Sequence, residues 1–232
     1  MPGFSIEASP IGRIVVAPEV PPGHRLFYTT IDSRGAIDAE LEAFAGMPVA
    51  HCNQVHGATV LGGGQALLPV RPHDAGRQAR VPVLHGECDA LWSSEPAALA
   101  IKTADCLPVS MIGSGTIANI HCGWRGAVQR IVDATLDVVG IPDAAWLGPS
   151  IRVCCFEVGE EVAQQFPAEF VDRSRAKPHV DIPAFIASRL RARGVPRTHD
   201  SELCTRCDGS IFHSFRRDGR SGGRNLAILV KQ

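Results

Sequence analysis

Short apolar runs in the middle of the chain predict buried strands. Three of them occupy residues 97–102 (AALAIK), 108–112 (PVSMI) and 116–121 (TIANIH). Apolar runs of this length, bounded by turn residues, are typical of strands inside a core. The Gly113–Gly115 stretch between the second and third runs predicts a tight hairpin. Two further strands are expected at 144–147 and 225–230.

After the third apolar run, the spacing of the apolar positions along the sequence changes. Between residues 124 and 139 the apolar positions recur every three or four residues, and Gly140 follows them. This spacing predicts an amphipathic helix directly after a strand. Similar spacing predicts helices at 157–166 and at 182–193. Strands and helices alternate irregularly around at least one hairpin, which favours an α+β fold with a mixed sheet over a doubly wound parallel one.

The remaining organisation indicates one domain. The segment 62–82 mixes glycine, proline and charge without a period, so we expect a surface loop there. No repeat and no low-complexity tract is present. A chain of 232 residues with 45% hydrophobic content can bury a full core, and this length fits a single domain over 1–232.

Composition and charge limit the classes of binding partner that the protein can have. The formal charge of -1 comes from 23 basic and 24 acidic residues, so we expect neither nucleic acid nor an anionic membrane as a partner. The sequence has no basic start leading into an apolar run, and it has no apolar stretch of roughly 18 residues. We therefore expect a cytoplasmic protein. In a reducing compartment, eight cysteines are expected to be buried thiols, metal ligands or nucleophiles.

Candidate chemistry is concentrated where two predicted strands meet. Cys106 lies just before one strand and His121 ends the next, so pairing across the hairpin would bring thiolate and imidazole together. The pair fits a histidine-activated cysteine nucleophile, or a metal with a third ligand from elsewhere. His56, among polar residues in NQVHG, is the natural third ligand. Such a set leaves one coordination position open, but spacing alone also permits core packing of all three residues.

The other cysteines carry weaker signals. Cys204 and Cys207 have C-x-x-C spacing, but one such pair without a second predicts no structural zinc site, so we interpret it as structural or incidental. Cys154 and Cys155 are adjacent near an expected helix start, and we do not expect their side chains to point to one side. We interpret these two, with the remaining cysteines, as core residues.

Charged residues near these motifs are ambiguous. Arg125 opens the helix expected after His121, and four arginines crowd the Gly-rich segment 216–224. Guanidinium groups and helix N-termini favour phosphate, although a basic loop is also typical of a solvated turn. Asp105 could orient a ligand, act as acid and base, or cap a turn. We favour a functional role for Asp105 and Arg125.

Taken in order, several motifs resemble one known family. They are NQVHG (53–57), TADCLPV (103–109), HCGWRG (121–126), GPSIRVCCFEVGEEV (148–162), CT (204–205) and SFRRDG with GR (214–219 and 223–224). From about His51 to the C-terminus the chain resembles the laccase-domain family. This family is also called polyphenol-oxidase-like or peptidoglycan editing factor, and its members are viewed as purine nucleoside phosphorylases. The resemblance implies zinc, with copper as an alternative, bound by His56, Cys106 and His121. It also implies an α+β fold of mixed β-sheets packed as a sandwich and flanked by helices.

The resemblance further implies an activity. This is phosphorolysis of adenosine, inosine, guanosine and methylthioadenosine to free base and sugar 1-phosphate, together with adenosine deamination. The partners are then a purine nucleoside and phosphate. Cys106, His121 and Asp105 would be catalytic, with Asp105 as proton shuttle for attack of water on purine C6. The substrate-binding residues would be Asn53, Gln54, Arg125, Arg216, Arg217 and Arg224.

The chain also departs from the family pattern. It carries TTIDSRG (29–35) where a Thr-Arg-x-Gly-Gly-x-Ser segment is usual, Cys122 replaces an alanine, His213 stands where an aromatic residue is common, and Gly222-Gly223 adds a residue before Arg224. These changes concern substrate range rather than the metal. Three alternatives remain: a copper-dependent polyphenol oxidase, a metal-free Cys–His hydrolase, and a metal-binding protein that edits cell-wall precursors.

Overall fold

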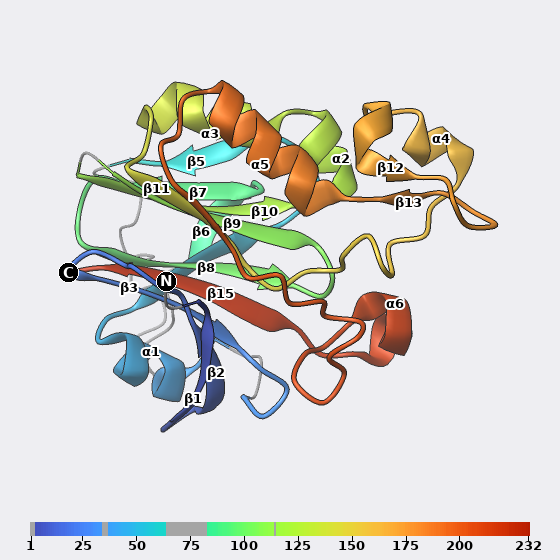
Figure 1. The fold of residues 1–232 in the computed structure, drawn as a ribbon. Coiled ribbons are helices and arrows are strands. Elements are labelled where there is room, and N and C mark those ends of the chain that lie inside the picture. The colour runs from blue at the N-terminus through green and yellow to red at the C-terminus, as the bar shows by residue number, and fades with distance from the viewer. Residues whose placement is uncertain (1–2, 34–36, 64–82, 114) are drawn as a thin grey trace.

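Two β-sheets pack face to face in the computed structural model, which describes residues 3–33, 37–63, 83–113 and 115–232 (Figure 1). One sheet has seven strands. In spatial order they are β1 (Ser5–Ser9), β2 (Gly12–Val16), β3 (His24–Thr29), β15 (Asn225–Lys231), β8 (Ala97–Thr103), β4 (Val49–Asn53) and β6 (Val83–Glu87).

The second sheet has six strands. In order they are β14 (Thr198–Asp200), β11 (Ala144–Leu147), β9 (Leu107–Gly113), β10 (Thr116–Cys122), β7 (Ala90–Ser93) and β5 (Val60–Gly62). Helices lie outside both sheets: α2 (Trp124–Val128), α3 (Ile131–Val139) and α5 (Ile182–Ala192) cover the six-stranded sheet, and α1 (Ala39–Ala45) covers the other (Figure 1). The remaining elements are α4 (Glu160–Ala163), β12 (Val171–Asp172), β13 (His179–Val180), α6 (Phe215–Asp218) and two short 3-10 turns, Ala168–Phe170 and Gly219–Ser221.

The central strands are unbroken apolar runs in the sequence because both of their faces are covered. Along β8, Leu99 and Ile101 point between the two sheets, whereas Ala98 and Ala100 point toward α1. Successive side chains alternate between the two faces of a strand, so a strand covered on both faces needs apolar residues at every position. The predicted α+β sandwich with flanking helices is confirmed.

The predicted hairpin is also confirmed, and it positions the candidate site. Strands β9 and β10 pair antiparallel, with Pro108 opposite His121 and Leu107 opposite Cys122. Cys106 directly precedes Leu107. The hairpin therefore delivers Cys106 and His121 to the same end of the six-stranded sheet.

Two helix predictions need correction. The single helix expected over 124–139 is two helices, because Arg130 adopts a left-handed conformation (φ 64°) between α2 and α3. The helix expected over 157–166 is only the four-residue α4. Its expected first turn is extended instead, since Glu157 bridges to His179 and the Val158 N–H donates to the Pro178 carbonyl at 2.9 Å.

The loop predicted at 62–82 begins at the end of β5, and its residues 64–82 lie outside the described part of the chain. Among the described residues, no helix combines the length and apolar character needed to cross a bilayer.

Candidate metal centre

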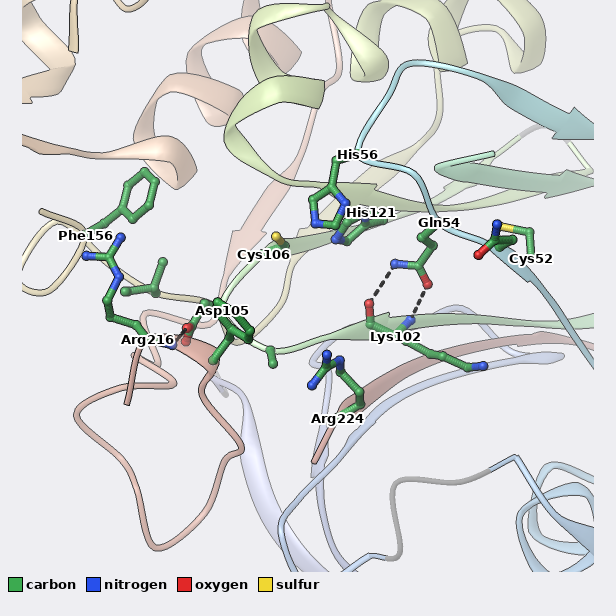
Figure 2. A pocket seen from close by; sticks show the side chains of 14 residues that line it. Cys52, Gln54, His56, Lys102, Asp105, Cys106, His121, Phe156, Arg216 and Arg224 are labelled. Carbon is green, nitrogen blue, oxygen red and sulfur yellow. Dashed lines mark hydrogen bonds between the residues drawn. The ribbon is translucent and has the colours of Figure 1, made fainter. Parts of the chain in front are cut away.

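Three segments that are distant in the sequence bring His56, Cys106 and His121 together. His56 lies on the loop after β4 in a left-handed conformation (φ 62°), Cys106 lies on the turn before β9, and His121 lies near the end of β10. One donor atom of each residue lies within 4.8 Å of the other two. Figure 2 shows the two imidazoles and the Cys106 sulfur converging on one point. Two nitrogen donors and one sulfur donor form a set that zinc accepts.

A buried carboxylate, that of Asp89, holds two of these segments in place. Its Oδ1 lies 2.7 Å from His121 Nδ1 and accepts the His56 backbone N–H at 3.0 Å, and its Oδ2 accepts the Gly57 N–H at 2.6 Å. Because a carboxylate only accepts, His121 Nδ1 carries the proton and Nε2 is the nitrogen left for a metal. Asp89 therefore sets both the tautomer of His121 and the path of the His56 loop.

The ionisation of the metal-free site follows from these contacts. Burial raises the pKa of Cys106, but hydrogen bonds from His121 and His56 outweigh it and bring the pKa to about 7. Burial lowers the pKa of His121, but Asp89 and the Cys106 sulfur raise it to about 9. Burial also opposes the ionised form of Asp89, yet His121 and the Gly57 N–H hold its pKa below the ordinary value. Near pH 8 these pKa values correspond to a Cys106 thiolate beside a His121 imidazolium.

Gly123 leaves the space in which the donors meet. A Cβ at this position would lie 3.1 Å from the Cys106 Sγ and 3.4 Å from the His56 Cδ2. The backbone of Gly123 is in the extended region that alanine also adopts (φ -71°). Glycine is therefore needed here for room rather than for conformation.

We expect Gly123→Ala to fold and to bind the metal about tenfold more weakly, because the new methyl group displaces Cys106 or His56 by a few tenths of an ångström. Competition with a chromophoric chelator measures the affinity. Gly3→Ala is the control, since a Cβ at Gly3 meets nothing within 4 Å. Equal affinity in Gly123→Ala and the wild type would contradict this role of Gly123.

A cavity of about 490 Å³ opens beside the three donors. Apolar side chains form one wall, and the guanidinium of Arg224 faces the donors from across the cavity (Figure 2). The lining residues near the donors are Cys52, Asn53, Gln54, Lys102, Ala104, Asp105, Ile151, Phe156, Phe215, Arg216 and Arg224. The candidate metal site thus opens onto a space that offers both apolar and cationic contacts.

A family model described as multi-copper polyphenol oxidoreductase laccase matches residues 30–232. The chain belongs to this laccase family. It is 38% identical over 192 residues to a purine nucleoside phosphorylase of Pseudomonas aeruginosa, across 77% of this chain and 72% of that protein. It is also 38% identical over 152 residues to adenosine deaminase RL5 from an unknown prokaryotic organism, across 58% of each protein. Its fold matches that of YlmD from Geobacillus stearothermophilus with a TM-score of 0.78 and 23% identity, over 99% of this chain and 98% of the other.

Several residues that the family resemblance predicts as substrate contacts do line the cavity. Asn53 is exposed there, whereas Gln54 uses its amide to bind the backbone of Lys102, donating at 2.7 Å and accepting at 2.8 Å. Arg216 donates to the Glu157 carbonyl at 2.8 Å. Among the described residues, Arg224 donates to the carbonyls of Gly222 and Gly223 in its own loop. With respect to the described part of the chain, Arg224 has no side-chain partner and faces the cavity, so its guanidinium is the one best placed for a ligand.

Two other predicted contacts lie elsewhere in the laccase-family fold. Arg125 is exposed, stacks on the Trp124 ring at 4.4 Å and is not among the residues that line this cavity. Arg217 binds Asp218 and donates to the Phe212 carbonyl at 2.8 Å, so it holds the loop that leads into α6. Their substrate roles stay predictions without a position in the cavity to support them.

Asp105 lies at the cavity but is already engaged. One carboxylate oxygen accepts the Thr205 hydroxyl at 2.7 Å, and the other accepts the Arg216 backbone N–H at 2.6 Å. Its backbone is left-handed (φ 88°) next to Cys106. Asp105 therefore ties the Cys106 turn to two C-terminal segments, while its role as a proton shuttle stays a prediction.

Several functional candidates in this laccase-family site were not predicted from the sequence. Asp89 is the clearest, and the apolar wall formed by Ile151, Phe156 and Phe215 is another. For Asp89 a signal existed, since a carboxylate that enters a buried strand must be paired to be stable. Nothing in the local pattern indicates which histidine it pairs with.

The shifted pKa values predict how metal binding depends on pH. Zinc needs the neutral His121 and the Cys106 thiolate, so binding must displace the His121 proton below about pH 9 and also the Cys106 proton below about pH 7. We therefore expect zinc affinity to rise with pH from 6 to 9, more steeply below pH 7 than above it. Calorimetry in buffers of different ionisation enthalpy measures the released protons. An affinity that stays constant from pH 6 to 9 would contradict these ionisation states.

Proposed function

We propose that this protein is a zinc-dependent purine nucleoside phosphorylase that also deaminates adenosine. The observation that carries the proposal is the position of the donors of His56, Cys106 and His121 at a cavity with an apolar wall and a facing arginine. A nucleoside and a phosphate need these two kinds of contact. The names of the relatives, a purine nucleoside phosphorylase and an adenosine deaminase, support the same chemistry.

The donor set fits a catalytic zinc ion. Three protein ligands leave a fourth position open, and the His121 imidazole is oriented by a carboxylate, an arrangement common around zinc. When bound, zinc would supply Lewis-acid chemistry at the edge of the cavity. We propose zinc on these grounds, with copper as the alternative cofactor.

For phosphorolysis, a phosphate oxygen bonds to C1′ of the ribose while the C1′–N9 bond breaks and its electron pair leaves with the purine, which takes up a proton. Arg224 would hold the phosphate, whereas Arg216, at the other end of the cavity and over the Phe156 ring, would contact the nucleoside (Figure 2). Phe156 and Phe215 would pack against the base. These residues would contribute to the rate mainly by holding both reactants in one cavity, because the reaction between bound reactants no longer requires a bimolecular encounter.

For deamination, water adds at purine C6 and ammonia leaves. Asp105 is the proposed proton shuttle because it is the cavity's carboxylate next to Cys106. Its hydrogen bonds to Thr205 and Arg216 hold it in a fixed position. Phosphate takes no part in this reaction, so the two activities can be separated by experiment.

Incubation of the purified protein with adenosine, with and without phosphate, tests the proposal. We expect inosine in both conditions, and adenine with ribose 1-phosphate only when phosphate is present. A chelator should abolish both activities, whereas a metal-free Cys–His hydrolase would survive chelation and be inactivated by iodoacetamide. The proposal is refuted if neither condition yields a product. In a separate binding measurement, tight muropeptide binding without turnover of any nucleoside would support cell-wall precursor editing instead.

The polyphenol oxidase alternative rests on the family's description. Multi-copper oxidation needs several copper sites with histidine ligands. Within the described part of the chain, the groups of three or more close metal-ligating side chains are the His56, Cys106 and His121 set and a group of four cysteines. A single histidine-containing set favours nucleoside chemistry over multi-copper oxidation.

We expect Arg224→Gln to raise the phosphate KM by about 10- to 100-fold, since a charge-assisted hydrogen bond is worth about 1.5–3 kcal/mol. Adenosine deamination should keep its rate, because that reaction uses no phosphate. Steady-state kinetics of the two activities side by side measure both effects. Arg191→Gln, an exposed change on α5, is the matched control. An unchanged phosphate KM would exclude Arg224 from the phosphate site.

A further inference from the structure

Four cysteines outside the candidate metal centre meet at one point. Cys154 and Cys155 lie in the turn that follows β11, and Cys204 and Cys207 lie in the turn that follows β14. Their four sulfur atoms all lie within 4.8 Å of one another. Cys155 and Cys204 are buried, whereas Cys154 and Cys207 are exposed. The proposed reaction uses none of them.

The sulfur separations match those of a tetrathiolate metal site. The Cys207 sulfur lies 3.3 Å from the Cys155 sulfur and 3.7 Å from the Cys154 sulfur. Four sulfurs around zinc at about 2.3 Å in tetrahedral geometry lie about 3.8 Å apart. A disulfide requires about 2.05 Å. All four cysteines are free thiols. They are therefore spaced for a shared cation rather than for pairwise bonding.

The backbone holds the two turns in this arrangement without the sulfurs. The Ser150 N–H donates to the Leu203 carbonyl at 3.2 Å, and the Thr205 N–H donates to the Ser150 carbonyl at 3.0 Å. Within the second turn, the Asp208 N–H donates to the Cys204 carbonyl at 2.9 Å. Cys204 and Cys207 have the C-x-x-C spacing typical of structural zinc sites. Cys154 and Cys155 are adjacent, and the expectation that they do not point to one side is wrong, because their turn brings both sulfurs to the cluster.

Two arginines lie close to the four cysteines. Zinc with four thiolates carries a net charge of -2, which needs compensation when it is partly buried. The Arg206 guanidinium lies beside the Cys155 sulfur, and Arg175 donates to the Cys154 carbonyl at 2.8 Å. Arg206 supplies compensating positive charge, and Arg175 supplies part of it, since its Nε also lies 3.5 Å from the Asp172 carboxylate.

We infer that Cys154, Cys155, Cys204 and Cys207 bind a structural zinc ion, separate from the ion of the three-ligand centre. Four protein ligands fill the coordination sphere, so this ion takes no substrate. Its position gives it a role, because Ile151 and Phe156 of the cavity wall flank the first turn. Thr205 in the second turn donates to Asp105 beside Cys106. The ion would thus fix one wall of the cavity and the turn that carries a ligand of the other metal.

Metal analysis of the full chain, purified under reducing conditions, tests this inference without any activity assay. We expect about two zinc ions per chain in the wild type and about one in Cys207→Ser, in Cys204→Ser and in His121→Ala. Combining Cys207→Ser with His121→Ala should remove both. Cys122→Ala, which deletes a buried thiol outside both sites, should keep both. A wild type with one ion that Cys207→Ser retains would overturn the inference, whatever substrate the protein turns over.

Cobalt substitution gives a second readout, and its result in the wild type does not depend on how any variant folds. Cobalt bound by four thiolates shows stronger and longer-wavelength d–d bands than cobalt bound by two imidazoles and one thiolate. We expect the tetrathiolate spectrum in the wild type and in His121→Ala, and its loss in Cys207→Ser. Absence of that spectrum in the wild type, or disulfide bonds among the four cysteines in anaerobically purified protein, would overturn the inference.

Discussion

A Cys106→Ser variant is expected to fold normally, to lose the metal of the three-ligand centre and to lose more than about 100-fold in kcat/KM for phosphorolysis. Serine is a poor zinc ligand, and removal of a ligand should cost more than the roughly 10- to 100-fold typical of the residues that support ligands. Folding should persist because Cys106 is only half-buried and lies outside the hydrophobic core. His121→Ala should also lose this metal and still fold, but with a lower free energy of unfolding, because it leaves the buried Asp89 carboxylate without its imidazole partner. Mass-spectrometric metal analysis, circular dichroism and steady-state kinetics measure the three effects.

Cys122→Ala is the control for Cys106→Ser. The Cys122 thiol is buried next to His121 but belongs to neither group of donors. We expect full metal content and activity in this variant. If Cys106→Ser instead keeps its metal and still loses activity, Cys106 acts as a nucleophile rather than as a ligand, and the metal-free Cys–His alternative gains support.

Asp89→Asn should have the second largest effect, a loss of roughly 10- to 100-fold in zinc affinity of the three-ligand centre. The amide has the shape of the carboxylate, but its nitrogen cannot accept, so one of the two acceptors is lost: either the Oδ1 that His121 and the His56 N–H use, or the Oδ2 that the Gly57 N–H uses. Leaving buried donors unpaired should also lower the free energy of unfolding by about 1–3 kcal/mol. Zinc titration and urea denaturation measure the two changes.

Kinetics at saturating zinc show whether Asp89 only positions the metal ligands or also takes part in the reaction. Asp89 is not among the residues that line the cavity and acts through His121 and the His56 loop, so an excess of zinc should restore much of the activity of Asp89→Asn. Asp137→Asn, which removes an exposed carboxylate paired with Arg193, is the matched control and should change neither affinity nor activity. A loss of activity that zinc does not restore would show that Asp89 does more than orient the ligands.

The fold was predictable where elements are local and well covered. Strands β8, β9, β10, β11 and β15 and helix α5 follow from apolar runs or helical periodicity. The N-terminal strand β1 gives no such signal, because it forms the exposed edge of its sheet and needs no buried face. The break at Arg130 could not be read from the pattern either, since apolar positions continue at helical spacing on both sides of it.

By itself, the sequence offered His56, Cys106 and His121 as candidate metal ligands, and it determined that one hairpin brings Cys106 and His121 together, because strands joined by a short turn pair with a predictable register. The tertiary structure decided the rest. It brought Asp89 to both histidines, left Arg125 outside the cavity, and assembled the four cysteines from turns about 50 residues apart. The C-x-x-C pair therefore gains the partner pair that spacing alone did not reveal. Local hydrophobic patterns predict contacts between residues that are close in the sequence. The contacts of Asp89 and of the four cysteines depend instead on the order of strands within each sheet and on the packing of the two sheets, and no local pattern records either.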